Sequence, residues 1–244
     1  MDFSFNAKTF RTLLHAAVAE HIEAITADTT TEESPEQLLA GMEKAIDVME
    51  RADADAAARQ GEAVLSDAEI TEIGDFALGL LEALVDRVEK ASGHQNRDLS
   101  RLAIPITLWI ARRGGHINKL ELVVNSLAAW ANELQDTIQI AELARVIREI
   151  IDAASDEIRQ DVEQTNPMRP WRIINLNYGI VATRSHDPVL MDEAFELLVK
   201  NLPGDARAFF REGMQQMDIV GYPDEVRAVV EKYDRMWGSG DTLH

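Results

Sequence analysis

Apolar residues recur along this chain at intervals of three and four positions, and that spacing predicts helices almost throughout. Polar loops, prolines and glycines separate the apolar stretches and divide the sequence into about ten helical segments. Alternation at a period of two never persists through a segment bounded by turn signals, so no strand is predicted. The predicted helices span 7–26, 35–50, 67–92, 97–113, 119–135, 138–164, 169–186, 188–201, 206–217 and 224–237.

Local signals define several of these boundaries. The pairs Ser34–Pro35 and Asp187–Pro188 each place an N-cap residue before a proline, which suits the first helical turn. The pairs Ser66–Glu69 and Asn118–Glu121 predict capping interactions at two further starts. Pro105 lies inside a segment whose apolar positions keep helical phase, so a kink is predicted there.

The loops between most of these helices are short, so consecutive helices are expected to form antiparallel hairpins. The sequence therefore predicts an all-α fold, either a helical bundle or a short α-solenoid. A chain of 244 residues with 46% hydrophobic residues buries a full-sized core. We expect a single all-helical domain over residues 1–237 and a disordered tail over 238–244.

The segment 169–186 is the predicted centre of the fold. Pro167 and Pro170 mark its start. Steps of 100° place apolar side chains on two opposite faces, Trp171, Ile174, Tyr178 and Val181 on one and Ile173, Leu176 and Ile180 on the other. A helix of this kind is predicted to lie between two layers of other helices.

A third stripe of polar or small residues runs along the same helix and consists of Arg172, Asn175, Gly179, Ala182 and His186. Glycine inside a helix costs roughly 1 kcal/mol relative to alanine, so a compensating contact is expected. One interpretation is close packing of a neighbouring helix against the bare backbone. The other is a groove whose floor is Gly179 and whose donors are Arg172 and Asn175.

Charge is unevenly distributed along the chain, and two stretches without acidic residues contain arginines. The chain has 43 acidic and 24 basic residues and a net charge of −19, which disfavours nucleic acid and anionic membranes as partners. Two windows nevertheless contain no acid, 99–120 and 164–186. The first includes Arg112 and Arg113, which the dipole at a helix C-terminus also explains. The predicted binding residues are Arg169, Arg172, Asn175, Gly179, His186, Arg112 and Arg113.

The stretch 171–203 resembles a single tetratricopeptide-type helical repeat. Trp171, Ile174 and Tyr178 match the first helix of that pattern, and Phe195 and Pro203 match the second helix and its end. The pattern expects small residues where this chain has Asn175 and Met191. The resemblance implies a module that binds proteins or peptides, with Arg169 and Arg172 at positions that line the groove and hold carboxylates.

Several kinds of chemistry find no support in the sequence. There is no cysteine, no phosphate-binding glycine motif, no metal-binding histidine spacing and no serine nucleophile motif. No catalytic residue, metal site or cofactor is predicted. The N-terminus has no secretory pattern and no apolar run is long enough to span a bilayer, so we expect a cytoplasmic protein without membrane partners.

The leading hypothesis is a non-enzymatic binding or adaptor protein whose partner is a protein, an acidic peptide or a small anion. A homodimer is also expected to be feasible, because stacked hairpins leave an apolar end face. Two alternatives remain open: an enzyme or anion sensor that uses Arg112, Arg113, Arg169 and Arg172, and a structural subunit of a larger complex. The double variant Arg169→Glu/Arg172→Glu is expected to keep thermal stability within a few degrees while abolishing capture of the partner.

Overall fold

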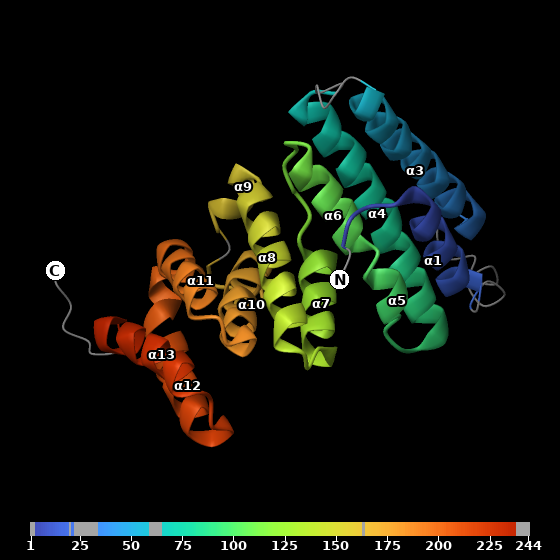
Figure 1. The fold of residues 1–244 in the computed structure, drawn as a ribbon. Helices are drawn as coiled ribbons and strands as arrows, with labels where there is room; N and C mark the ends of the chain where they lie inside the picture. Colours follow the sequence, from blue (N-terminus) through green and yellow to red (C-terminus); the bar gives the residue numbers. More distant parts are fainter. Residues whose placement is uncertain (1–2, 20, 22–33, 59–64, 163, 238–244) are drawn as a thin grey trace. The chain divides into compact units, whose positions relative to one another are not determined.

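The computed structural model describes residues 3–19, 21, 34–58, 65–162 and 164–237, and these ranges are predominantly helical (Figure 1). They contain no strand, and the one extended pairing among them is an isolated bridge between Ile117 and Ala154. The all-α prediction is therefore confirmed, while the choice between bundle and solenoid stays open. None of the described helices combines the length and the apolar composition that crossing a membrane requires.

Internal contacts divide the chain into two compact units. The N-terminal unit comprises Asp2–Trp130 with Asp152–Ile158, and the C-terminal unit comprises Ala131–Ile151 with Arg159–His244. Whether both units fold as the single domain 1–237 stays a prediction. The predicted tail 238–244 lies outside the described residues.

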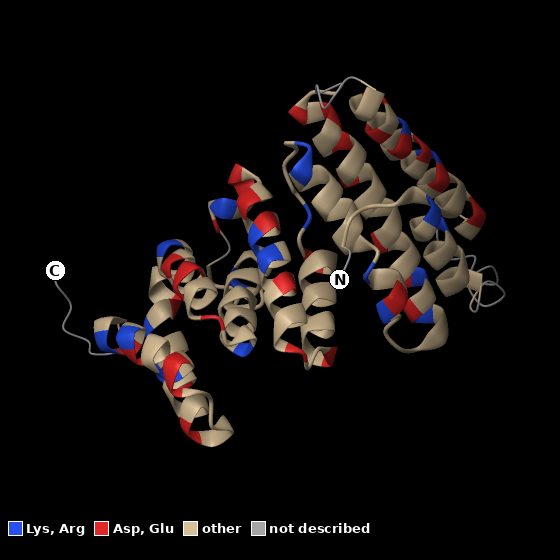
Figure 2. Ribbon diagram, viewed as in Figure 1, with Lys and Arg blue, Asp and Glu red and all other residues tan. Residues whose placement is uncertain are grey.

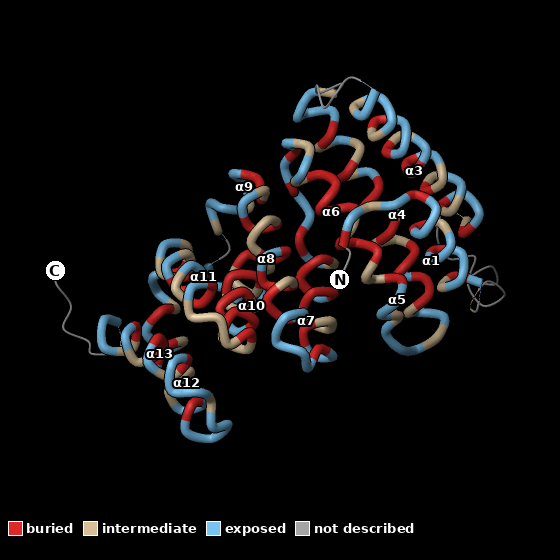
Figure 3. Tube along the Cα trace, viewed as in Figure 1, coloured by how far each residue is buried: buried red, intermediate tan, exposed pale blue. Residues whose placement is uncertain are grey.

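The N-terminal unit is a set of helices in which α4 is central. In chain order its helices are α1 (Ala7–Ala19), α3 (Pro35–Ala58), α4 (Asp67–Ser92), α5 (Arg97–Ser100), α6 (Ala103–Arg112) and the greater part of α7 (Glu121–Glu133). Helix α4 packs against α3, α5 and α6, and α1 packs against α3 and α5. Buried positions follow the facing sides of these helices (Figure 3). Their apolar side chains include Leu14, Met42, Leu81 and Ile106, which have no measurable exposure.

The capping signals that depend on near neighbours are confirmed. Ser66 accepts a hydrogen bond from the Glu69 N–H, and the Glu69 carboxylate accepts from the Ser66 N–H at 2.8 Å. The bond from the Ser66 N–H, together with one from the Ser66 hydroxyl at 2.8 Å, lowers the pKa of Glu69, because both favour the charged carboxylate. Ser34 stands before Pro35 as predicted, with its N–H donating to the Gln37 side chain. The predicted first helix, 7–26, is observed as far as Ala19, and residues 20 and 22–26 lie outside the described ranges.

The predicted kink at Pro105 is instead a break upstream of it. Helix α5 ends at Ser100, α6 begins at Ala103, and Arg101 and Leu102 form a turn. Pro105 has no N–H to donate to the Arg101 carbonyl four residues earlier, and its ring crowds that carbonyl. The Arg101 carbonyl accepts from the Ile104 N–H at 3.1 Å instead. Pro105 consequently lies in the first turn of α6, where proline is tolerated.

The predicted sixth helix also ends early. Helix α8 (Thr137–Ala153) stops before Ala154, and the four-residue α9 (Asp156–Arg159) follows. Ile117 explains the interruption, because its N–H donates to the Ala153 carbonyl at 2.8 Å and its carbonyl accepts from the Ser155 N–H at 2.9 Å. These bonds compete for main-chain groups that a continuous helix would use internally.

The predicted cap by Asn118 is not observed. Its side-chain amide donates to an Asp75 carboxylate oxygen at 2.7 Å, and α7 begins three residues later at Glu121. A long-range partner has therefore replaced the local interaction that the sequence suggested.

The C-terminal unit contains most of α8 together with α10 (Pro170–Ser185), α11 (Pro188–Asn201), α12 (Pro203–Val220) and α13 (Asp224–Trp237). Helices α10 and α11 form one hairpin and α12 and α13 another. Phe195, Phe210 and Tyr233 form an aromatic core with ring centroids 5.1 Å apart. Asp187 caps α11 as predicted, accepting from the Val189 and Leu190 N–H groups.

Helix α10 is not covered on both sides as the sequence suggested. Its buried face contains Trp171, Ile174 and Tyr178, which are 4%, 1% and 1% exposed. The opposite apolar face is only partly covered, since Ile173 and Leu176 are half-buried and Ile180 is 48% exposed. Within the polar and small stripe, Asn175, Gly179 and Ala182 are buried, whereas Arg172 and His186 at its ends are half-buried. The small residues allow neighbouring side chains to approach closely.

The one-sided burial of α10 predicts unequal effects of two truncations on the same helix. Tyr178→Ala is expected to lower the free energy of unfolding by about 3 kcal/mol, because it leaves a cavity in the core. Ile180→Ala is expected to lower it by less than about 1 kcal/mol. Urea unfolding followed by circular dichroism measures both. Equal losses for the two variants would contradict the assigned faces.

Candidate functional site

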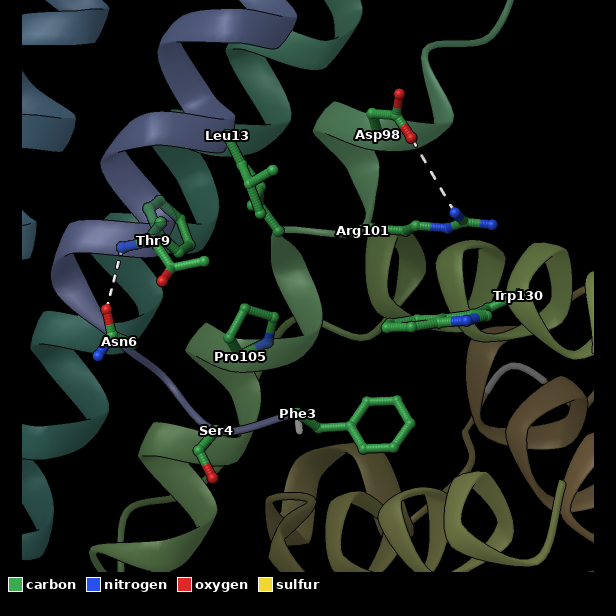
Figure 4. Close-up of a pocket in the computed structure, with 11 residues that line it drawn as sticks. Phe3, Ser4, Asn6, Thr9, Leu13, Asp98, Arg101, Pro105 and Trp130 are labelled. Carbon is green, nitrogen blue, oxygen red and sulfur yellow. Dashed lines mark hydrogen bonds and ion pairs between the residues drawn. The ribbon is translucent and has the colours of Figure 1, made fainter. Parts of the chain in front are cut away.

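An apolar cavity of the N-terminal unit lies where the first residues of the described chain pass α1, α5, α6 and the end of α7 (Figure 4). We call it the Phe3–Trp130 cavity. It has a volume of about 270 Å³ and is lined by Phe3, Ser4, Asn6, Thr9, Phe10, Leu13, Asp98, Arg101, Leu102, Pro105 and Trp130. Most of its wall is carbon, and its polar groups come from short side chains and one ion pair.

Local interactions position the segment that forms one wall. The Asn6 side chain accepts from the Thr9 N–H at 3.0 Å and so caps the start of α1. Phe5, directly before this cap, packs its ring 5.5 Å from that of Phe10, the arrangement of a hydrophobic staple. The staple fixes the direction in which the chain enters α1. Phe3 is thereby held against the unit at 7% exposure.

Two aromatic rings form the opposite part of the wall. The centroids of Phe3 and Trp130 are 4.9 Å apart and their planes are inclined by 55°. The Arg101 guanidinium carbon lies 5.2 Å from the centre of the Trp130 ring, a cation–π contact. Trp130 remains half-buried, and Leu13 on α1 is 51% exposed. The cavity therefore presents apolar surface to water beside a charged rim.

Among the arginines predicted to bind a ligand, Arg169 is engaged within the chain. Its guanidinium donates to both Asp161 carboxylate oxygens, at 2.5 and 2.9 Å, and its Nη1 donates to the main-chain carbonyls of Gln164 and Asn166. The side chains of Arg169 and Asp161 are each only 10% exposed. The hydrogen bond to Asp161 raises the pKa of Arg169, so the guanidinium stays charged. This arginine holds the segment before α10 in place.

Arg172 and Asn175 also have internal partners. Arg172 pairs with Asp205 at the start of α12, with Nη2 2.6 Å from the carboxylate. Asn175 is 1% exposed, donates to the Trp171 carbonyl and accepts from the Asn201 amide at 2.8 Å. An anionic ligand at the start of α10 would have to compete with these contacts, so the binding role of the pair stays a prediction.

Gly179 has the close packing that one interpretation proposed. A methyl group built on Gly179 would lie 2.6 Å from the Phe209 ring and 3.3 Å from Leu198. The packing explanation is thus confirmed, and Gly179 does not form the floor of an open groove. His186 follows the last residue of α10 in a left-handed conformation with φ of 58°, and its ring packs 5.5 Å from that of Tyr222.

Arg112 and Arg113 lie in the other unit, at the end of α6. Arg112 is exposed and donates to the Ser4 hydroxyl at 3.0 Å. Arg113 pairs with Asp53 and lies over the Trp109 ring, whose N–H also donates to Asp53. The Asp53 carboxylate in α3 thus accepts the hydrogen bond of the buried Trp109 indole and also pairs with Arg113. The structure gives Arg113 a tertiary contact that the helix-dipole explanation did not require.

The sequence prediction missed the Phe3–Trp130 cavity, although one local signal was available. Phe5 and Phe10 flank the Asn6 cap at the spacing of a hydrophobic staple, which indicates that residues before α1 pack onto it. The contribution of Trp130 had no such signal, because it is 127 positions from Phe3. Within the described ranges, no three His, Cys, Asp or Glu residues are placed to hold a metal ion.

Comparison of the chain with protein-family models, with curated proteins and with solved structures finds no match in any of the three.

The Arg169–Asp161 pair makes a testable contribution to stability. Arg169→Gln is expected to lower the free energy of unfolding by about 3 kcal/mol, because it leaves Asp161 buried without its partner. The exposed Arg207, replaced in the same way, is expected to change it by less than about 0.5 kcal/mol. Urea unfolding provides the measurement. This revises the expectation that substitution of Arg169 leaves stability almost unchanged.

A double variant tests whether the loss of stability comes from the buried Asp161 carboxylate that Arg169→Gln leaves unpaired. Asp161→Asn combined with Arg169→Gln removes both charges and is expected to be more stable than Arg169→Gln alone. Asparagine also tolerates the left-handed backbone of Asp161, whose φ is 49°. A double variant less stable than the single one would show that Asp161 acts independently of Arg169.

Proposed function

We propose that this protein is a non-enzymatic binding module that takes one large apolar side chain of a partner protein segment in the Phe3–Trp130 cavity. The observation that carries the proposal is the cavity itself, in which a half-buried tryptophan, a phenylalanine and an exposed leucine meet. Binding energy at protein interfaces is concentrated where an aromatic or aliphatic anchor fills such a pocket.

The size of the cavity supports a side chain rather than a whole cofactor. Its volume of about 270 Å³ is several times the roughly 30 Å³ of a water molecule and lies below the roughly 300–1,000 Å³ of small-molecule sites. An anchor entering here would remove Leu13 and Trp130 from water. Full burial of a leucine side chain contributes roughly 1.5–3 kcal/mol, and Leu13, which is 51% exposed, still has about half of its surface to bury.

The charge of the molecule favours some partners over others. A net charge of −19 repels acidic chains and increases the rate at which basic ones associate. At the rim, Arg101 lies near Asp98, with 4.0 Å between Nη1 and Oδ1, so both signs are present locally. The proposed partner is therefore a segment with one large apolar anchor and no acidic run, in place of the acidic peptide that the sequence suggested.

Selection from a library of random displayed peptides tests the proposal. Peptides enriched on the wild-type protein are expected to share one large apolar residue at a fixed position. Leu13→Asp is expected to weaken their binding at least about tenfold, because it places a charge at the mouth of the cavity. Leu13 is half-exposed, so the variant should keep its fold, which circular dichroism verifies.

The matched control is Phe76→Asp, which introduces the same charge at an apolar residue of α4 that is 56% exposed and does not line the cavity. It is expected to leave peptide affinity within about twofold of the wild type. The proposal fails if no peptide is enriched, or if the enriched peptides bind Leu13→Asp as well as they bind the wild type.

A further inference from the structure

The rim of the Phe3–Trp130 cavity has a charged group of each sign, and the two differ in how far a partner can reach them. Among the residues that line the cavity, Asp98 and Arg101 are the charged ones. They belong to α5 and to the turn that follows it, and Figure 2 shows basic and acidic positions next to each other in this helix. The rest of the lining is apolar or uncharged, so these two groups decide which charge a partner can carry beside its apolar anchor.

Arg101 packs onto the aromatic wall of the cavity. Its guanidinium carbon lies 5.2 Å from the centre of the Trp130 ring, and its side chain is 23% exposed with Nε buried. The face of Trp130 that attracts a cation is therefore already covered from within the chain. A carboxylate of a partner could reach only the outer edge of this guanidinium. Arg101 is thus part of the wall rather than an open contact for an acidic residue.

Asp98, in contrast, is open to a partner. Its side chain is 87% exposed, and its Oδ1 lies 4.0 Å from Nη1 of Arg101. That separation exceeds the roughly 2.7–2.9 Å of a charge-assisted hydrogen bond. Figure 4 shows the Asp98 carboxylate pointing toward the Arg101 guanidinium rather than toward the rings of Phe3 and Trp130. A carboxylate has several acceptor sites, so Asp98 can keep its contact with Arg101 and accept hydrogen bonds from a second cation.

We infer that the partner segment carries a lysine or arginine beside its apolar anchor, and that Asp98 accepts hydrogen bonds from this cation while the anchor fills the cavity. The inference rests on the proposed function, because Asp98 can select among segments only if the cavity takes an anchor. The aliphatic stem of a lysine or arginine can lie along Leu13, which is 51% exposed, while its charged end stays in water at Asp98. Asp98 is accordingly assigned as a residue that determines specificity.

An acidic residue beside the anchor meets the opposite environment. Asp98 repels it at short range, and the net charge of −19 repels it at longer range. Arg101 cannot compensate, because its guanidinium is stacked on Trp130. Acidic residues are therefore expected to be depleted next to the anchor.

Parallel selections of random displayed peptides, on the wild-type protein and on Asp98→Lys, test the inference. Both selections are expected to enrich the large apolar residue, because the cavity is retained. Lysine or arginine is expected at a preferred position near it on the wild type, and this preference is expected to disappear or to change to aspartate or glutamate on Asp98→Lys. Asp98 is 87% exposed, so the variant should keep its fold, which circular dichroism verifies.

A double-mutant cycle measures the contact itself. One peptide enriched on the wild type is synthesised with its basic residue and with glutamine in its place, and both forms are titrated against the wild type and Asp98→Asn. Each replacement alone is expected to weaken binding about threefold, as for an exposed ion pair, and the two together no more than about threefold, because both remove the same contact. Independent losses that multiply to about ninefold would overturn the inference, as would an affinity that Asp98→Asn leaves unchanged.

The matched control is Asp55→Asn, which removes the same charge at an exposed residue of α3 that does not line the cavity. It is expected to change the affinity of the same peptide by less than about 1.5-fold, because solvent and salt screen a distant surface charge. Equal weakening by Asp98→Asn and Asp55→Asn would attribute the preference to net charge and overturn the role of Asp98.

The outcomes separate this inference from the proposed function. Enrichment of the apolar residue without a basic neighbour, or with the same basic neighbour on Asp98→Lys, overturns the role of Asp98 and leaves the cavity as the binding site. Failure to enrich any peptide overturns the proposed function, and the inference fails with it.

Discussion

Ile117 makes the interaction on which the organisation of the N-terminal unit depends. Its main-chain N–H and carbonyl bond to Ala153 and Ser155, which lie 36 and 38 positions later in the sequence. This pairing interrupts what the apolar periodicity indicates as one long helix and brings residues 152–158 into the N-terminal unit, although the chain on both sides of them belongs to the other. The Ile117 side chain is completely buried, so hydrophobic burial supports the bonds.

The proposed function follows from a different constraint, the incomplete burial of aromatic surface beside α1. The hydrophobic staple between Phe5 and Phe10 directs the chain so that Phe3 reaches Trp130. The resulting wall is apolar, but Trp130 and Leu13 remain partly in water. In contrast, the arginines before and within α10 are held by Asp161 and Asp205. The Phe3–Trp130 cavity thus has apolar surface in contact with water, whereas Arg169 and Arg172 are already paired within the chain.

The sequence predicted those features that depend on neighbours within a turn or two. The Ser66–Glu69 capping box, the Asp187 cap and the helical class follow from local hydrogen bonding and periodicity, and the structure confirms them. Gly179 was identified as a position that needs a compensating contact, but periodicity could not name Phe209, which lies on another helix. The sequence predicted a kink at Pro105, whereas the helix breaks a few residues earlier, because a proline affects the turn that precedes it. The Phe3–Trp130 cavity required contacts between residues more than a hundred positions apart, which no local pattern contains.

The tryptophan side chains themselves provide the most direct measurement of the central claim. In ¹⁵N-labelled protein, titrated with a selected peptide that carries one large apolar residue, the indole resonance of Trp130 is expected to shift. Those of Trp109 and Trp171, which are 3% and 4% exposed and do not line the cavity, should remain in place. Binding of the peptide without any change at Trp130 would contradict the account and place the interaction elsewhere on the protein.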